Sequence, residues 1–224
     1  MAEVDGGRRA RHLLFEEVNF RMAKDKLTAA ALDIDVAEVS NRIAAWIKST
    51  VTGTLKRHGV VVGISGGIDS SVVAALAAKA LGPKRVLGLF TPERDSSSET
   101  LDLSRMLADA IGVEALLEDI TDVLDAAGCY RRRDDAIRLV MPEYAEGWKA
   151  KIVLPSLSEG DRIPMFSVVA RDPAGETKRA RLSPSAYLGV VAATNFKQRT
   201  RKMIEYHHAD RLNYAVAGTP NRLE

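Results

Sequence analysis

The sequence has a single cysteine and no long apolar run, and each absence excludes a class of protein. Cys129 is the only cysteine among the 224 residues, so no disulfide can form within the chain, and a reducing cytoplasmic location is predicted. No run of about 18 apolar residues occurs, and no apolar segment follows the arginines at positions 8, 9 and 11. We therefore expect neither a membrane span nor an export signal.

An excess of charge of one sign is also absent, with 32 Lys and Arg against 30 Asp and Glu and a formal net charge of +2. The densest basic run, Arg131–Arg133, is followed at once by Asp134 and Asp135, which is typical of a solvated helix face. We expect no nucleic-acid partner. Hydrophobic residues make up 46% of the chain, which is enough to bury one α/β core.

The most informative stretch that is present is Val61–Ser71, which reads Val-Val-Gly-Ile-Ser-Gly-Gly-Ile-Asp-Ser-Ser. An apolar strand runs into a turn with two adjacent glycines, and apolar residues at helical spacing follow from Val72 to Leu81. Glycines allow a tight turn that directs several backbone N–H groups to one point, and a helix N-terminus favours negative charge there. The spacing is neither that of a Walker A loop nor Gly-x-Gly-x-x-Gly. The stretch predicts a site for pyrophosphate.

The motif Ser65–Ser70 resembles the PP-loop of the N-type ATP pyrophosphatases, which split ATP between its α and β phosphates to activate an oxygen for amination or thiolation. Two later segments narrow the resemblance. Asn195–Met203 reads Asn-Phe-Lys-Gln-Arg-Thr-Arg-Lys-Met, and Gly218–Glu224 follows the apolar strand Tyr214–Ala217. In order and spacing both are similar to motifs of the NAD synthetase family. The resemblance covers roughly residues 35–130 and 183–224.

Alternating helical and strand patterns predict an α/β fold, a doubly wound parallel sheet with helices on both faces, Rossmann-like and similar to the adenine nucleotide alpha hydrolases. A helix with Leu101, Met106 and Ile111 on its apolar side is expected between two of the strands. The other expected elements are a helix from Val36 to Val51, widened by Trp46, and strands at Val60–Ile64, Arg85–Phe90 and about Val113–Leu117. Ligands bind such sheets at the carboxyl ends of the strands. We therefore expect Ser65–Ser70, Thr91–Pro92 and Gly218–Thr219 to converge on one cleft.

For the domain organisation we expect a leader and a first helix over 1–34 and the PP-loop domain over 35–224. Within that domain, residues 141–183 form an irregular insertion that is predicted to make hairpins. Its β-like runs are Lys151–Leu154, Met165–Val169 and Lys178–Leu182. We interpret it as a tolerated surface insertion, with a lid or an oligomer contact as open alternatives. The family continues past the position of Glu224, so the C-terminal part of the family domain is expected to be absent, and the chain is either a fragment or a truncated protein.

The resemblance implies an ATP site, a magnesium site and a dinucleotide site. Asp69 and Glu224 would ligate Mg²⁺ as hard oxygen ligands, although a helix N-cap and a surface carboxylate are the plainer alternatives for these two residues. Asn195, Arg199 and Arg201 would bind nicotinic acid adenine dinucleotide (deamido-NAD), since guanidinium groups suit phosphate and carboxylate. The residues implied for ATP are Gly63, Ile64, Ser65, Gly66, Gly67, Ile68, Asp69, Ser70 and Thr219.

The implied reaction is amidation of deamido-NAD to NAD through an adenylated carboxylate, with release of AMP and pyrophosphate. It requires no side-chain nucleophile. Glutamine-using members of the family carry an N-terminal glutaminase domain of a few hundred residues, but only about sixty residues precede the PP-loop here, so ammonia is the predicted nitrogen donor. The resemblance also implies a homodimer. Two alternatives remain open: another PP-loop amide-forming ligase, such as a GMP synthetase or a tRNA-lysidine synthetase, and an ATP-binding or dimerisation module without turnover.

Overall fold

The computed structural model describes residues 33–154 and 166–219. The chain divides into two compact units, Met1–Val36 and Ala37–Glu224, and the elements discussed below belong to the second, apart from the first residue of α1. The helix expected near the N-terminus and the predicted metal ligand Glu224 lie outside the described residues.

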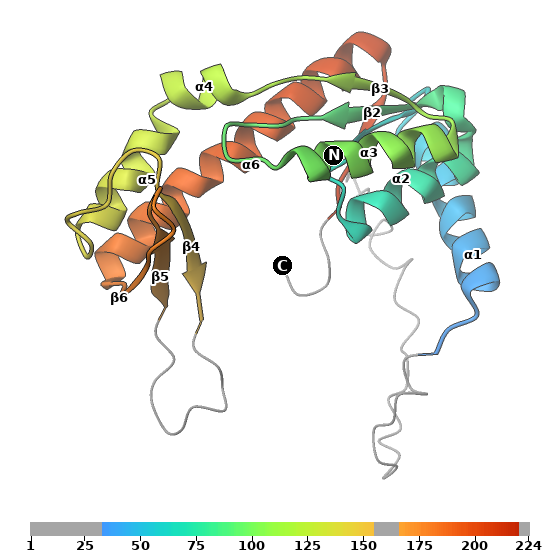
Figure 1. The fold of residues 1–224 in the computed structure, drawn as a ribbon. Coiled ribbons are helices and arrows are strands. Elements are labelled where there is room, and N and C mark those ends of the chain that lie inside the picture. Colours follow the sequence, from blue (N-terminus) through green and yellow to red (C-terminus); the bar gives the residue numbers. More distant parts are fainter. Residues whose placement is uncertain (1–32, 155–165, 220–224) are drawn as a thin grey trace, which may run out of the picture. The chain divides into compact units, whose positions relative to one another are not determined.

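Four short parallel strands form the central sheet, in the order β3-β2-β1-β7 (Figure 1). The two central strands, β1 and β2, are apolar and mostly buried, as expected for strands covered on both faces, whereas β3 and β7 at the edges are partly exposed. Their bounds are β1 Val60–Gly63, β2 Val86–Phe90, β3 Glu114–Leu117 and β7 Ala215–Ala217. Because β2 and β3 lie on one side of β1 and β7 lies on the other, the strand order reverses at β1.

Side chains alternate between the two faces of this sheet, and different helices cover each face. Val60 and Val62 of β1 pack with α2 and α3, whereas Val61 packs with α6. Figure 1 shows the same arrangement, with α6 on the opposite side of the strands from α2 and α3. The helical segments are α1 Val36–Lys48, a π-helical turn Ser49–Thr54, α2 Ile68–Leu81, a 3₁₀ turn Pro83–Arg85, α3 Ser98–Ile111, α4 Thr121–Ala126, α5 Cys129–Arg138 and α6 Pro184–Leu212. The predicted doubly wound α/β fold is therefore confirmed.

A second, antiparallel sheet is formed within residues 141–183, the segment predicted to be an insertion, in the order β4-β5-β6. Its strands are β4 Lys149–Val153, β5 Ser167–Arg171 and β6 Thr177–Arg181. One face contributes Ile152, Val168 and Ala180 to a hydrophobic cluster with α5 and the N-terminal half of α6. The prediction of short strands in hairpins is confirmed, with bounds that differ by one or two residues where both ends are described.

The apolar side predicted for α3 is wrong at one position. Leu101 and Ile111 pack against the core, but Met106 is 62% exposed. Helical spacing places residues 101, 108 and 111 on one side of α3. The small side chain of Ala108 is buried on that side, at the contact with the sheet. Trp46 likewise does not extend the buried side of α1, because its side chain is 57% exposed.

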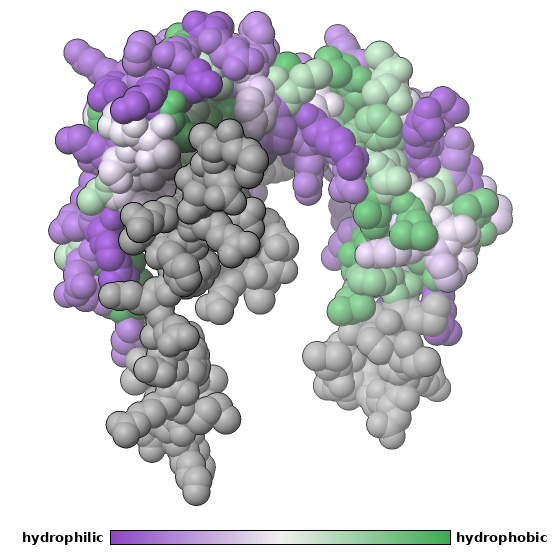
Figure 2. Space-filling view, turned by 180° about the vertical axis from the view of Figure 1, so that it is seen from behind, coloured by the Kyte–Doolittle hydropathy of each residue, from purple (hydrophilic) through white to green (hydrophobic). Residues whose placement is uncertain are grey.

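No helix within residues 33–154 and 166–219 is long and apolar enough to cross a membrane. In the space-filling view of one side, hydrophilic and hydrophobic side chains are interspersed over the described surface (Figure 2).

The contact between β2 and α6 provides a test of the core. Leu89 is fully buried in the face of the sheet that α6 covers, so Leu89→Ala leaves a cavity and is expected to lower the free energy of unfolding by about 2–5 kcal/mol. Met106→Ala on the exposed side of α3 is the matched control, with an expected change within about 0.5 kcal/mol. Urea unfolding followed by circular dichroism measures both. Equal destabilisation by the two substitutions would contradict the packing described here.

Candidate functional site

The loop between β1 and α2 is held in shape by its own hydroxyl groups. The Ser70 hydroxyl lies 3.0 Å from the Gly67 carbonyl oxygen, to which it donates, and it accepts a 3.2 Å hydrogen bond from the Ser65 backbone N–H. The Ser71 hydroxyl donates to the same Gly67 carbonyl at 2.8 Å. Ser70 is buried, so its hydroxyl forms these hydrogen bonds on the inner side of the loop. The loop thus keeps a fixed turn at the N-terminus of α2.

Gly66 occupies a position that only glycine suits. Its φ angle is +72°, and a Cβ atom there would lie 2.6 Å from the backbone carbonyl oxygen of Thr100 in α3. Both the left-handed backbone and the close approach of α3 therefore require the absence of a side chain. Gly63 is constrained from the other side, because a Cβ would lie 2.7 Å from the carboxylate oxygen Oε1 of Glu205 in α6.

A cleft of about 680 Å³ opens above this loop, and we call it the switch-point cleft because it lies where the strand order reverses. Its walls come from the ends of β1, β2 and β7, from the start of α3 and from α6. The lining includes Ser65, Gly67 and Asp69 from the loop, Thr91 and Pro92 after β2, and Gly218 and Thr219 after β7. The predicted convergence of these three segments is confirmed.

The residues predicted for the site divide into two groups. Those that line the switch-point cleft are Gly63, Ile64, Ser65, Gly67, Asp69, Ser70, Arg201 and Thr219. The remaining described residues, Gly66, Ile68, Asn195 and Arg199, do not line it. Gly66 acts through the backbone geometry above, Ile68 is 79% exposed, and Arg199 lies exposed on α6.

Sequence reasoning missed the polar face that α6 turns to the cleft. Gln198, Lys202 and Glu205 line it together with Arg201. Glu205 is 4% exposed, and its Oε2 accepts a 2.6 Å hydrogen bond from the Lys202 ammonium group. The i, i+3 and i, i+4 spacing of these residues was the available signal, because such residues share one face of a helix. The buried carboxylate and its partner form a fixed charged wall opposite the loop.

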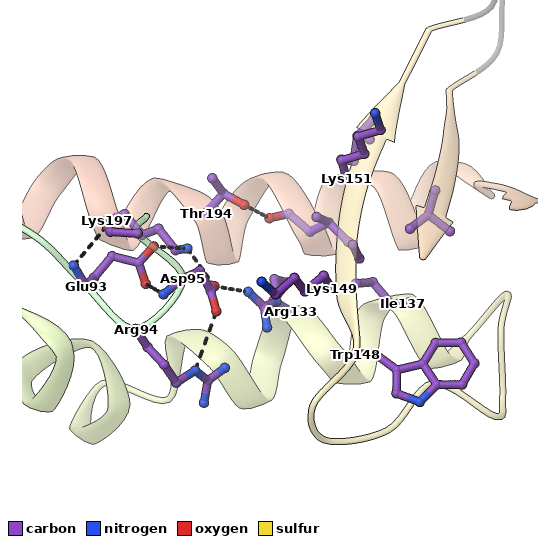
Figure 3. A pocket seen from close by; sticks show the side chains of 15 residues that line it. Glu93, Arg94, Asp95, Arg133, Ile137, Trp148, Lys149, Lys151, Thr194 and Lys197 are labelled. Carbon is purple, nitrogen blue, oxygen red and sulfur yellow. Dashed lines mark hydrogen bonds and ion pairs between the residues drawn. The ribbon is translucent and has the colours of Figure 1, made fainter. Parts of the chain in front are cut away.

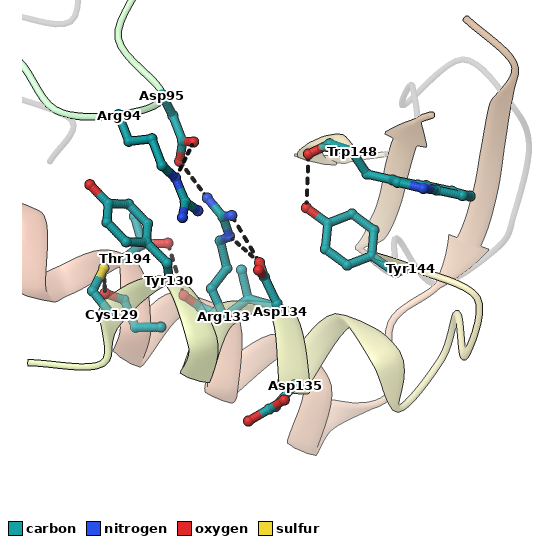
Figure 4. A network of polar contacts seen from close by, with 12 residues as sticks. Arg94, Asp95, Cys129, Tyr130, Arg133, Asp134, Asp135, Tyr144, Trp148 and Thr194 are labelled. Atoms are coloured by element: carbon teal, nitrogen blue, oxygen red, sulfur yellow. Dashed lines mark hydrogen bonds and ion pairs between the residues drawn. The ribbon is translucent and has the colours of Figure 1, made fainter. Parts of the chain in front are cut away.

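A second polar network lies beside the cleft, around the chain that follows β2. The Glu93 carboxylate is buried, accepts a 2.9 Å hydrogen bond from the Tyr130 hydroxyl and lies 2.7 Å from the Lys197 ammonium nitrogen. Lys197 also contacts Asp95 at 3.0 Å, and Asp95 pairs with Arg133 (Figures 3 and 4). The network ties α5 and α6 to the segment that supplies Ser96 to the switch-point cleft.

The network changes the titration of its members. Burial, followed by the hydrogen bond to Glu93, raises the pKa of the Tyr130 hydroxyl. Burial alone would raise the pKa of Asp95, but the hydrogen bond from Lys197 and the charge of Arg133 together lower it. The interpretation of Arg131–Arg133 as a solvated face is thus wrong for Arg133, whose side chain is 16% exposed and pairs with Asp134 at 2.8 Å as well as with Asp95.

Sequence and structure comparisons find similarity to NAD synthetases. Residues 39–143 match the sequence model of the NAD synthase family. The chain is 52% identical over 209 residues to the NH₃-dependent NAD(+) synthetase of Rhizobium meliloti (strain 1021), covering 92% of this chain and 62% of that protein. It is 54% identical over 193 residues to the NH₃-dependent NAD(+) synthetase of Mesorhizobium japonicum, covering 86% of this chain and 60% of that protein.

The solved structure of the NH₃-dependent NAD synthetase from Campylobacter jejuni shares the fold, with a TM-score of 0.54 and 22% identity over 85% of this chain and 58% of that one. The chain spans about 60% of the length of the relatives from Rhizobium meliloti and Mesorhizobium japonicum.

The loop geometry gives a direct prediction for Gly66→Ala. The new methyl group must push against a backbone carbonyl in a left-handed conformation, so the free energy of unfolding is expected to fall by more than about 1 kcal/mol. Gly53→Ala is the control, since a Cβ at Gly53 meets no atom within 4 Å and alanine favours a helical turn. Comparison of urea midpoints measures the difference. A Gly66→Ala protein as stable as the Gly53→Ala protein would show that the turn does not need glycine.

Proposed function

We propose that this chain, which matches the NAD synthase family model over residues 39–143, catalyses the ATP-dependent amidation of deamido-NAD to NAD with ammonia as nitrogen donor. The observation that carries the proposal is the Ser65–Ser70 loop at the switch point, facing Thr219 and Arg201 across one cleft. The relatives from Rhizobium meliloti and Mesorhizobium japonicum are named for ammonia dependence, which supports the choice of donor.

In the proposed reaction a carboxylate oxygen of the nicotinate ring attacks the α-phosphorus of ATP, and the bond to the β-phosphate oxygen breaks to release pyrophosphate. The nitrogen of ammonia then attacks the carbon of the adenylated carboxylate, AMP leaves with the bonding electron pair, and the nitrogen loses a proton to water. No covalent bond to the protein is required. The rate enhancement comes from alignment of the two substrates and from neutralisation of the phosphate charge.

Several groups that line the switch-point cleft support this proposal. Backbone N–H groups at the N-terminus of α2 would hold the phosphates, because unpaired donors and the helix dipole favour an anion. Arg201 and Lys202 add positive charge on the opposite wall, and Glu205 keeps Lys202 in place. Thr219 supplies a hydroxyl at the end of β7. We propose that Asn195 and Arg199, which lie on α6 outside this cleft, contact the dinucleotide.

We propose that the cleft also holds a magnesium ion. Magnesium in nucleotide sites is held by one or two carboxylates together with substrate phosphates, and Asp69 presents an exposed carboxylate to the cleft in the first turn of α2. We propose that Asp69 and Glu224 hold the ion, Glu224 being outside the described residues. When bound, the ion would neutralise charge that develops on the phosphate oxygens.

We also propose that the protein is cytoplasmic and forms a homodimer. Sedimentation of the purified protein would test the homodimer.

The assignment of Asp69 predicts a specific loss. Asp69→Ala is expected to lower magnesium-dependent NAD formation by at least about 100-fold, because a ligand for the charge-neutralising ion is removed, while the urea midpoint stays unchanged. Asp102→Ala is the matched control, since this carboxylate is 72% exposed on α3 and pairs only with Arg105 among the contacts of the described residues. Steady-state rates at several magnesium concentrations measure both. Full activity in the Asp69→Ala protein would remove the metal assignment.

The function itself is tested by incubating the protein with ATP, magnesium, ammonium and deamido-NAD and by quantifying NAD and AMP in the same sample. Formation of NAD and AMP in equal amounts is the expected result, because each amidation consumes one ATP. AMP formed with another acceptor but not with deamido-NAD would indicate a different PP-loop ligase. Binding of ATP without any AMP would indicate a nucleotide-binding module.

A further inference from the structure

The antiparallel sheet has one face that gathers positive charge, and we call it the outer face. Side chains alternate along each strand, so Ile152, Val168 and Ala180 point to the hydrophobic cluster beneath the sheet and their neighbours in the strands point away from it. None of the three strands contains an acidic residue. The outer face carries five cationic side chains, all of them exposed: Lys149, Lys151, Arg171, Arg179 and Arg181.

The register of the sheet brings these charges close together. Lys149 lies directly opposite Arg171, and Lys151 and Arg179 lie on either side of Val169. Neighbouring strands are about 4.8 Å apart, and alternate residues of one strand are about 6.8 Å apart, so the five charges fall within about 10 Å by 14 Å. The formal net charge of the whole chain is only +2, so the outer face is a local concentration of positive charge.

Ion pairs do not neutralise the outer face. Asp172, in the turn after β5, accepts a 2.8 Å hydrogen bond from the backbone N–H of Glu176 and pairs with no cation among the described residues. Like charges directly opposite one another destabilise a sheet, so the Lys149–Arg171 pair has a cost that a bound anion would remove. Among the contacts of the described residues, four of the five cationic side chains form no ion pair, namely Lys149, Lys151, Arg171 and Arg179.

Part of the outer face is hollowed. A depression of about 360 Å³ is lined by Lys149, Lys151 and Arg171 together with Val169 and Thr177. Ammonium, guanidinium and hydroxyl groups all donate hydrogen bonds, and the first two form the stronger, charge-assisted bonds to phosphate oxygens. The depression thus presents donors from three neighbouring strands to a protruding anionic group.

The composition of the outer face favours a nucleic acid over other anionic partners. Protein–protein interfaces have an apolar centre that is depleted of charge, whereas protein–nucleic acid interfaces are more polar and much more positively charged. The apolar side chains on this face are Val153 and Val169, both only partly exposed, which leaves little to insert into a membrane. None of the three strands has an aromatic residue on which the bases of a single strand could stack.

We infer that the outer face binds double-stranded nucleic acid through its phosphates, without reading the base sequence. A duplex carries one phosphate charge per about 1.7 Å of its axis, so about 14 Å of duplex presents about eight phosphates to a patch of this size. The sequence-based expectation of no nucleic-acid partner considered runs of basic residues along the chain. The outer face instead combines cations from three strands, which only the register brings together.

The test is the fluorescence anisotropy of a labelled DNA duplex of about 20 base pairs, titrated with the full chain between about 50 and 200 mM salt. We expect saturable binding with a Kd of about 1–10 µM at the lowest salt, which weakens steeply as salt is added because counterions are released. Lys149→Gln combined with Arg171→Gln is expected to weaken binding at least about tenfold and to make the slope of log K against log salt shallower by about 2.

Two control variants remove the same amount of charge elsewhere. Arg131→Gln with Arg132→Gln changes two exposed residues of α5 and should leave the affinity within about threefold. Arg199→Gln with Arg201→Gln changes the arginines of α6 that are proposed to bind the dinucleotide, and it should also leave the affinity within about threefold. This second control separates duplex binding on the sheet from the substrate contacts on α6. Circular dichroism verifies that each variant folds.

Equal affinity in the Lys149–Arg171 and Arg131–Arg132 variants would overturn the proposal, as would an absence of saturable binding. Loss of binding in the Arg199–Arg201 variant alone would assign the duplex to the substrate site and would also overturn it. A single strand that binds as tightly as the duplex, or displacement of the duplex by poly-glutamate at equal charge, would contradict recognition of a duplex. The measurement requires no turnover, so failure of the proposed amidation and failure of this surface are distinguishable.

Discussion

The position of β1 between β2 and β7 is the constraint on which the functional site depends. Parallel pairing on both sides of β1 aligns the carboxyl ends of three strands, and the reversal of strand order leaves an opening above them. The turn after β1 must then pass between α3 and α6, so that Gly66 has no room for a side chain and a Cβ at Gly63 would displace the Glu205 carboxylate. The conformation of the loop thus follows from the sheet and its covering helices as much as from its own hydrogen bonds.

The polar network around Glu93 fixes the segment after β2, which lines the same cleft. A buried carboxylate is tolerable only when its oxygens are satisfied, and here a tyrosine hydroxyl, a lysine and a backbone N–H supply the donors. These donors come from α5, α6 and the loop itself, so the segment after β2 is fixed to two helices. Ser96 and Ser97 of that segment face the switch-point cleft, and the position of Ser96 is therefore set by contacts outside that cleft.

The sequence was sufficient to predict the parallel sheet and the placement of the Ser65–Ser70 loop, because strand spacing and paired glycines are local signals. It failed where the outcome depended on which face of a helix meets the sheet. Met106 lies outside the α3 contact, and Glu205 is buried beside Gly63 although it is charged. The contact between Glu93 and Lys197 spans 104 positions along the chain, so no local pattern indicates it. Arg133 was misjudged for the same reason, since its partner Asp95 lies on a distant loop.

The hydrophobic cluster beneath the antiparallel hairpins shares no buried residue with the clusters on either face of the parallel sheet. The antiparallel sheet thus rests on its own small core, joined to the rest of the described domain mainly through α5 and α6. Changes of length or side chain in the hairpins therefore need not repack the sheet beneath the Ser65–Ser70 loop. The architecture separates hairpins that pack on a core of their own from a loop in which, at Gly66, even a single methyl group is excluded.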